Sequence, residues 1–322
     1  MKTLALIVAL VGSCVLPSIA APAEEPAELK TAGGTLYGTL LVPDSPRRVP
    51  AVLLIAGSGP TDRNGNSTLL PGPNNSLKLL AEGLAARGIA SLRFDKRGIA
   101  ASKEAGLSEK DVRFDTFVDD AAAWAARLHE DLRFTSVTIV GHSEGALIGA
   151  LASQRGAAVS FVSIAGVSRT ADVVLRGQLA GKLPPDLLEI SERTLTALKS
   201  GKTVDDVPPP LAALYRPSVQ PYLVSWFRYD PIVELKKLTI PVLIVQGSTD
   251  IQVAVDDARA LAAAKPDARL EIIDGMNHVL KIVDADAGRQ MASYSDPALP
   301  LSTRLVEVIA AFVSVTSANS RP

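Results

Sequence analysis

A serine between two glycines stands where a strand-like run of sequence turns into a helix-like one. The apolar, β-branched run SVTIV at residues 136–140 leads into GHSEG at 141–145, and an Ala/Leu-rich stretch follows at once. Because glycine lacks a Cβ, Gly141 and Gly145 leave room in a crowded turn, and Ser143 can adopt a strained backbone conformation. This pattern is typical of a turn that presents a nucleophilic serine hydroxyl to a carbonyl carbon.

A serine hydroxyl is a weak nucleophile at neutral pH, so it needs a base to take its proton and a carboxylate to orient that base. The chain has three histidines. His129 lies on the polar side of a helical run, and His142 adjoins the serine, so we expect its ring to leave the turn in another direction. His278 follows the strand-like run at 269–273, in a loop that a parallel sheet would place at its carboxyl edge. The sequence predicts His278 as the base, and a loop histidine bonded to the local backbone is the other interpretation.

The orienting acid should follow a strand between the serine and the histidine. Asp250 does so, because the apolar run at 240–246 ends in a Gly-Ser-Thr-Asp turn. An aspartate at such a place can also be a helix N-cap or an Asx-turn residue. Asp256 and Asp257 are rival acids, but they fall in the first turn of a helical run at 254–264. Negative charges there would interact favourably with the helix dipole. Asp250 is therefore the predicted acid.

Attack on a carbonyl also requires donors for the oxyanion that develops, and preoriented backbone amides meet this need. The amide of Glu144, directly after the serine, is one candidate. The second should come from the loop after an earlier strand, and the apolar run at 52–56 opens into Gly-Ser-Gly at 57–59. We predict the amide of Ser58, with Gly59 as the alternative. A glycine loop without a catalytic role is the other interpretation of this segment.

The order Ser143, Asp250, His278 resembles that of the α/β-hydrolase superfamily, whose catalytic triad runs Ser, Asp, His along the chain. The segment RFDKRG at 93–98 resembles the family's RxDxRG loop, which is structural, although Ala100 stands where a later glycine is usual. The resemblance covers nearly all of the mature chain. It implies an α/β fold with a mostly parallel central sheet, helices on both faces and a helical cap insertion.

A narrower resemblance comes from two loops. Ala56-Gly57 stands where many members carry His-Gly. This variant, together with the loops GPTDRNG at 59–65 and GMNHVLK at 275–281, is similar to the sequences of a bacterial branch of exported carboxylesterases, which is grouped with serine aminopeptidase-like hydrolases. This kinship implies an esterase more than a peptidase. Dehalogenases and most epoxide hydrolases of the superfamily use an aspartate nucleophile, so Ser143 argues against both.

The amino-terminal segment has the features of a secretory signal peptide. A positive start, an apolar run at 4–11 and a small-residue site predict cleavage after Ala20 or Ala23 and export to the periplasm or beyond. The apolar run is too short to favour a membrane span. VGSC at 11–14 loosely resembles a lipobox, so a lipid anchor at Cys14 is an alternative.

Composition excludes several other classes of function. At 322 residues and 47% hydrophobic content, the chain can bury a large core, and its net charge of −1 gives no reason to expect nucleic acid as a partner. Cys14 is its single cysteine, so the body of the chain has no disulfide and no thiol nucleophile. The sequence has no HExxH motif and no paired Cys/His spacing, so we expect neither a bound metal nor another cofactor.

Strand-like and helix-like runs alternate on both sides of one interruption. We predict a signal peptide at 1–23, a first part of the core at 24–167, a helical, proline-punctuated cap insertion at 168–238 and a second part of the core at 239–322. Five of the fourteen aromatic residues fall in this cap, where they could line a substrate pocket or anchor the cap to the core: Tyr215, Tyr222, Trp226, Phe227 and Tyr229.

Taken together, these residues predict a serine hydrolase that cleaves small carboxylic esters through an acyl-enzyme on Ser143. Two alternatives stay open: a peptidase, amidase or thioesterase with the same triad, and a non-catalytic binding module, although such modules generally lose a triad member. Hydrolysis should slow as the pH falls through about 6 to 7, because a protonated imidazole cannot accept a proton.

Overall fold

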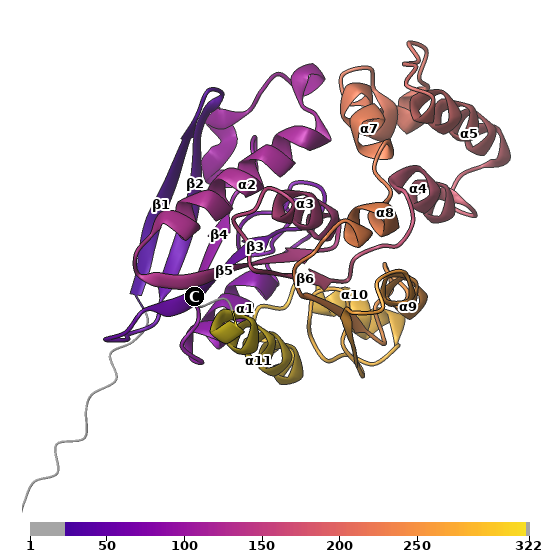
Figure 1. Ribbon diagram of the computed structural model, residues 1–322. Helices are drawn as coiled ribbons and strands as arrows, with labels where there is room; N and C mark the ends of the chain where they lie inside the picture. The colour runs from indigo at the N-terminus through magenta and orange to yellow at the C-terminus, as the bar shows by residue number, and fades with distance from the viewer. Residues whose placement is uncertain (1–22, 320–322) are drawn as a thin grey trace, which may run out of the picture.

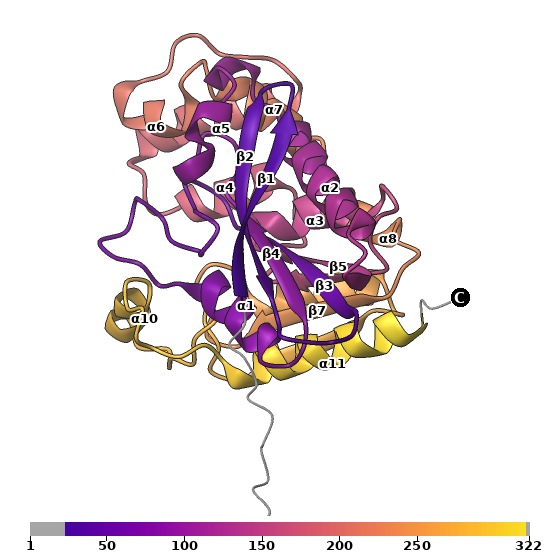
Figure 2. The ribbon, with the colours of Figure 1, turned by 90° about the vertical axis from the view of Figure 1, so that its left-hand side faces the viewer.

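The computed structural model of the protein describes residues 23–319, which form one eight-stranded sheet with helices around it (Figure 1). The strand order is β1-β2-β4-β3-β5-β6-β7-β8, and every pair from β4 to β8 is parallel. The β1-β2 hairpin runs antiparallel, as does the β2-β4 pair (Figure 2). The predicted mostly parallel sheet is confirmed. The strands are β1 (Ala23–Thr31), β2 (Gly34–Val42), β3 (Val49–Ile55), β4 (Ala90–Phe94), β5 (Phe134–His142), β6 (Ser160–Ile164), β7 (Val242–Gly247) and β8 (Arg269–Ile273).

The central strands are near-continuous apolar runs because helices cover both faces of the sheet. All residues of β4, β6 and β7 are buried. By contrast, β1 at the sheet edge is mostly exposed and carries charged side chains, which discourage pairing with another chain. This difference between central and edge strands places the hydrophobic core on both sides of β3, β5 and β6.

The helices form two layers. On one face α2 and α3 pack against the sheet, and on the other face lie α1 and α11 (Figure 1). Trp124 of α2 and Phe161 of β6 are among the largest buried side chains of the first layer. The helices outside the β6-β7 connection are α1 (Ser76–Ala85), α2 (Phe114–Glu130), α3 (Glu144–Ser153), α9 (Val255–Ala264), α10 (Ala287–Ser293) and α11 (Thr303–Asn319).

The connection from β6 to β7 is helical and has a small hydrophobic core of its own, which includes Leu195, Tyr215 and Phe227. Its helix α7 contacts α2 and the 3₁₀ turn η2 (Glu109–Asp111), so the connection lies beside the first helical layer (Figures 1 and 2). Its elements are α4 (Ala171–Leu179), α5 (Pro185–Lys199), the 3₁₀ turn η3 (Pro209–Leu211), α6 (Ala212–Tyr215), α7 (Gln220–Phe227) and α8 (Pro231–Lys236).

Two residues of the RFDKRG loop after β4 form ion pairs that hold the loop to the rest of the core, in line with the structural role suggested by the sequence. Asp95 is bound by the Arg63 guanidinium, and Arg97 is paired with the buried Asp120 of α2. Ala100, which replaces the usual glycine, begins the 3₁₀ turn η1 (Ala100–Ala105) with φ at 44°. An alanine is strained in this left-handed region, where glycine is not.

None of the helices within residues 23–319 has the length and apolar character needed to cross a membrane. Residues 1–22 of the predicted signal segment, with Cys14 and the cleavage site after Ala20, lie outside the described residues, whereas Ala23, the alternative cleavage point, is the first residue of β1.

Candidate active site

The serine turn has the crowded geometry that its two glycines predict. Ser143 alone connects β5 to α3, with φ at 56° and ψ at −121°, which is strained for a residue with a side chain. A Cβ on Gly141 would lie 2.1 Å from the Gly145 carbonyl oxygen, and a Cβ on Gly145 would lie 2.4 Å from that of Ile55. Only glycine fits at either position, so the surrounding backbone holds the turn in its strained form.

Asp250 and His278 meet at the carboxyl edge of the sheet, in the loops that follow β7 and β8. The Nδ1 atom of His278 lies 2.8 Å from Oδ2 of Asp250, and both side chains are buried. Oδ2 also accepts a hydrogen bond from Gln246, while Oδ1 accepts from the backbone amides of Gln252 and Val253. Asp250 is thus an Asx-turn residue through one oxygen and the partner of the histidine through the other.

The electrostatics of Asp250 favour its ionised form. Burial alone would raise the pKa of its carboxyl, but the neighbouring His278 and the backbone amides of Val253 and Gln252 outweigh burial, and the pKa is lowered. A carboxylate can only accept, so Nδ1 of His278 carries the hydrogen of the shared bond. In the neutral ring, Nε2 is then the nitrogen with a free lone pair, which is the atom that a general base uses.

His142 makes a contact that the sequence does not signal. Its ring packs beside that of His278, with ring centroids 4.8 Å apart, and its Nε2 lies 2.9 Å from the His278 carbonyl oxygen. The reason is that His142 ends β5 in the centre of the sheet, where the loop after β8 covers it. Burial, then the proximity of His278, lowers the pKa of His142 to about 3, so this ring stays neutral. His129 is exposed on α2, as predicted.

The predicted oxyanion loop lies directly against the serine turn. Ile55 of β3 pairs with Gly141 of β5, so the residues after both strands emerge side by side. A Cβ on Gly57 would lie 3.2 Å from Cβ of Ser143. Ser58 and Gly59 are exposed beyond it. The structure therefore brings the loop at 57–59 to the serine turn, while the role of its amides stays a prediction.

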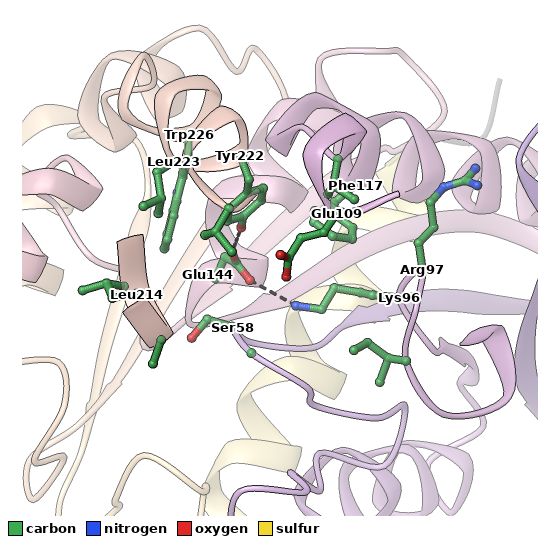
Figure 3. A pocket seen from close by; sticks show the side chains of 15 residues that line it. Ser58, Lys96, Arg97, Glu109, Phe117, Glu144, Leu214, Tyr222, Leu223 and Trp226 are labelled. Atoms are coloured by element: carbon green, nitrogen blue, oxygen red, sulfur yellow. Dashed lines mark hydrogen bonds and ion pairs between the residues drawn. The ribbon is translucent and has the colours of Figure 1, made fainter. Parts of the chain in front are cut away.

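A cavity of about 330 Å³ opens beside this loop, under helix α7 (Figure 3). Most of its walls are apolar, and its lining side chains come from the loops after β3 and β4, from α2 and from the helical connection. They include Phe117, Leu214, Leu223, Trp226 and the Glu144 carboxylate. Ser143 lines a narrower space of about 20 Å³ on the other side of Glu144 and Trp226, which border both spaces. The larger cavity thus adjoins the serine without including it.

Three lining side chains of this cavity, which the sequence does not connect, contact one another (Figure 3). Nζ of Lys96 lies 3.1 Å from Oε2 of Glu144, and both side chains are about 95% buried, with 5% and 4% exposed. The Tyr222 hydroxyl, from α7, donates to the other carboxylate oxygen. Burial, together with the Glu144 charge, raises the pKa of Tyr222 well above its ordinary value, so the hydroxyl keeps its hydrogen. The sequence resemblance implies a structural role for the loop that contains Lys96. No sequence pattern near Lys96 predicts its contact with Glu144.

The aromatic residues of the connection divide between the two roles left open by the sequence. Tyr222 and Trp226 line the cavity. Tyr215 and Phe227 belong to the core of the connection, where the Tyr215 hydroxyl bonds to Ser191. Tyr229 donates to Asp115 at the start of α2 and so anchors the connection to the core.

The rival acids lie away from His278. Asp256 is exposed and pairs with Arg259. Asp257 lies in the first turn of α9, as predicted, and it also accepts hydrogen bonds from the backbone amide and hydroxyl of Ser168 and from Arg169. The physical reason is that α9 starts beside the segment that leaves β6, so this carboxylate holds the beginning of the helical connection. Across residues 23–319, no group of three His, Cys, Asp or Glu side chains is arranged to hold a metal ion.

Residues 52–287 match the model of the Alpha/beta hydrolase family, which is more than half of the chain. The chain belongs to this family. Esterase EstD of Thermotoga maritima is 30% identical to this chain over 250 residues, 76% of its length. The aligned region spans 58% of the EstD sequence, so EstD is considerably longer.

Solved structures show the same α/β-hydrolase fold at low sequence identity. Est1E from Butyrivibrio proteoclasticus superimposes with a TM-score of 0.61 at 19% identity, covering 91% of this chain and 99% of Est1E. A puromycin-hydrolyzing peptidase from Mycobacterium tuberculosis gives a TM-score of 0.57, also at 19% identity, covering 94% of this chain but 40% of the peptidase. At these identities the likeness speaks for the fold alone.

Proposed function

We propose that the protein is a serine hydrolase that cleaves small carboxylic esters through an acyl-enzyme on Ser143. The observation that carries the proposal is the buried hydrogen bond between Asp250 and His278, at the same sheet edge as a serine held in a strained turn. Such a pairing is what a base requires before it can activate a serine. The similarity to Esterase EstD supports ester cleavage as the reaction.

In the proposed mechanism Nε2 of His278 takes the proton of the Ser143 hydroxyl as its oxygen attacks the ester carbonyl carbon. Asp250 stabilises the imidazolium that forms, and the amides of Ser58 and Glu144 donate to the oxyanion. The imidazolium then protonates the departing alcohol, which leaves an acyl group on the serine. Water, deprotonated by His278, attacks the acyl carbon. The bond to the serine oxygen then breaks, this oxygen takes the proton back from His278, and the carboxylic acid is released.

The acidic side chains of the cavity favour an ester over a peptide with a free amino terminus as substrate. A site for a substrate ammonium group would need an available carboxylate. Glu109 is bound by Arg216 and Ser218, and Glu144 is bound by Lys96 and Tyr222. Both carboxylates are thus already satisfied, and the remaining walls suit an apolar acyl or alcohol group.

The proposal is tested with Ser143→Ala on a panel of matched esters, thioesters and amides. We expect turnover of short-chain esters to fall by roughly three orders of magnitude or more, with the unfolding transition retained. A fluorophosphonate probe should label the wild type at Ser143, and the exposed Ser314→Ala variant serves as a matched control that labels normally. Retained hydrolysis in Ser143→Ala would reject the nucleophile. Amides cleaved as fast as their matched esters would favour the amidase alternative, and an absence of both turnover and labelling would favour the binding module.

We further propose that the protein is exported, with residues 1–23 as its signal peptide and a lipid anchor at Cys14 as the alternative. The apolar run and the small-residue site support export. Mass spectrometry of the amino terminus after expression distinguishes the outcomes. A mature chain that begins at Ala21 or Glu24 supports cleavage, one that begins at a lipidated Cys14 supports the anchor, and an intact Met1 contradicts both.

A further inference from the structure

Lys96 forms a hydrogen bond that a simple ion pair would not require. Besides its contact with Glu144, its Nζ donates to the backbone carbonyl oxygen of Gly57, with a distance of 2.6 Å. The loop at 57–59 carries one proposed oxyanion donor, and Glu144 carries the other. One buried ammonium group therefore links the two segments that must be held in register for an oxyanion to be bound.

The bond to Gly57 also fixes the direction of the neighbouring amide. The carbonyl oxygen of Gly57 and the N–H of Ser58 belong to one planar peptide unit, and in a trans peptide they point in opposite directions. When Lys96 holds the oxygen on one side, the N–H must point to the other side. A hydrogen bond accepted by the carbonyl also polarises the peptide and makes its N–H a stronger donor.

We propose that Lys96 is a positioning residue that orients and polarises the Ser58 amide for the oxyanion. This inference rests on the proposed function, because it concerns how the proposed donors are preorganised. Glu144 and Tyr222 complete the arrangement: the carboxylate neutralises the buried ammonium, and the tyrosine hydroxyl holds the carboxylate from helix α7.

The site is built for a fixed ammonium group. The Lys96 side chain is 5% exposed, and its Nζ lies 5.5 Å from the centroid of the Phe117 ring, within reach of a cation–π contact. With Gly57, Glu144 and Phe117 around it, the ammonium cannot move without losing several contacts at once. Preorganisation of this kind allows donors to act without rearranging during the reaction.

The decisive variant is Lys96→Met, which keeps a long apolar side chain and removes the donor. We expect kcat for a short-chain ester to fall by roughly 10- to 100-fold, less than the loss of a whole oxyanion donor, with KM within about twofold of the wild type. A trifluoromethyl ketone, which forms a tetrahedral adduct with the serine, should lose affinity by the same factor as kcat/KM. The shape of the pH profile should not change, because Asp250 and His278 are untouched.

Lys265 provides a matched control in the same chain. It is also a buried lysine whose Nζ donates to a backbone carbonyl, that of Leu238 at 2.9 Å, and to a carboxylate, that of Asp267 at 2.9 Å. It lies at the end of α9, outside the cavity. Lys265→Met should therefore lower stability while kcat and inhibitor affinity stay at wild-type values.

A double variant separates positioning from charge neutralisation and also guards against misfolding. In Lys96→Met/Glu144→Gln no unpaired charge is buried, so the fold should be retained. A kcat that stays 10- to 100-fold low supports the action of Lys96 on Gly57. Recovery of wild-type kcat in the double variant would overturn it, as would full activity and inhibitor affinity in Lys96→Met. If Ser143→Ala retained hydrolysis, the proposed function itself would fail, a result distinct from either.

Discussion

The Nε2 atom of His142 donates a hydrogen bond to the backbone carbonyl oxygen of His278, at 2.9 Å. A carbonyl oxygen can only accept, so Nε2 of the neutral His142 ring carries the hydrogen. Asp250 holds the His278 side chain while His142 holds its main chain. The loop after β8 is thereby fixed at both the ring and the backbone of its histidine.

This arrangement predicts a stability that declines in acid because of His142. The folded chain keeps the ring neutral down to about pH 3, whereas the unfolded chain takes up a proton near pH ~6.5. Between these values protonation favours the unfolded state, so stability present above about pH 6.5 is lost as the pH falls, by about 1.4 kcal/mol per pH unit from this group. Urea unfolding at pH 7 and pH 5 measures the loss. His142→Gln, which keeps a donor, should show a shallower decline, and an equal decline in both proteins would contradict the prediction.

Asp250→Asn should leave the fold intact and reduce kcat/KM by about three to four orders of magnitude. An amide at this position can donate to His278, which favours the tautomer with its hydrogen on Nε2 and removes the lone pair that the base needs. Steady-state ester hydrolysis measures the effect. Asp256→Asn, at an exposed aspartate away from His278, is the matched control and should behave as the wild type. A loss below tenfold in Asp250→Asn would argue that another group orients the histidine.

The parts of the site that could be predicted from the sequence are those that depend on residues close together in the chain. The two glycines and the change from strand to helix periodicity predict the turn around Ser143. The strands before Asp250 and His278 are predicted by their apolar runs. Because parallel strands deliver their carboxyl ends to one edge, these patterns also place Asp250 and His278 at the same end of the sheet. Their hydrogen bond follows from the fold.

The contacts that escape prediction join segments with no local relationship. Glu144 is 48 residues from Lys96 and 78 from Tyr222, and its partners depend on how α7 docks over the core. The position of His142 against the His278 backbone likewise depends on the path of a loop 136 residues away. Periodicity and spacing report which face an element buries, but not which polar side chains meet across it.

Ala100→Gly should raise the free energy of unfolding by about 0.5–1 kcal/mol. Relief of the left-handed strain at φ 44° is worth about 1–2 kcal/mol, and the greater freedom of glycine in the unfolded chain offsets part of it. Ala100 is exposed, so little packing is lost. Chemical denaturation compares the variant with Ala101→Gly, the neighbouring position without a positive φ, where glycine should destabilise instead. A destabilised Ala100→Gly would show that the alanine is not strained.

Trp226 separates the narrow space at Ser143 from the larger cavity, so its removal should change the preferred acyl length. The indole borders both spaces and stacks on Phe114 with ring centroids 5.7 Å apart. Trp226→Ala would join the two spaces and should raise kcat/KM for longer acyl esters relative to acetate, by roughly 10-fold or more, since each additional buried methylene contributes about 0.8 kcal/mol. A series of esters from acetate to decanoate measures the profile. Phe227→Leu, within the core of the connection, is the control that should lower stability without shifting the profile. An unchanged profile in Trp226→Ala would mean that the larger cavity does not receive the acyl chain.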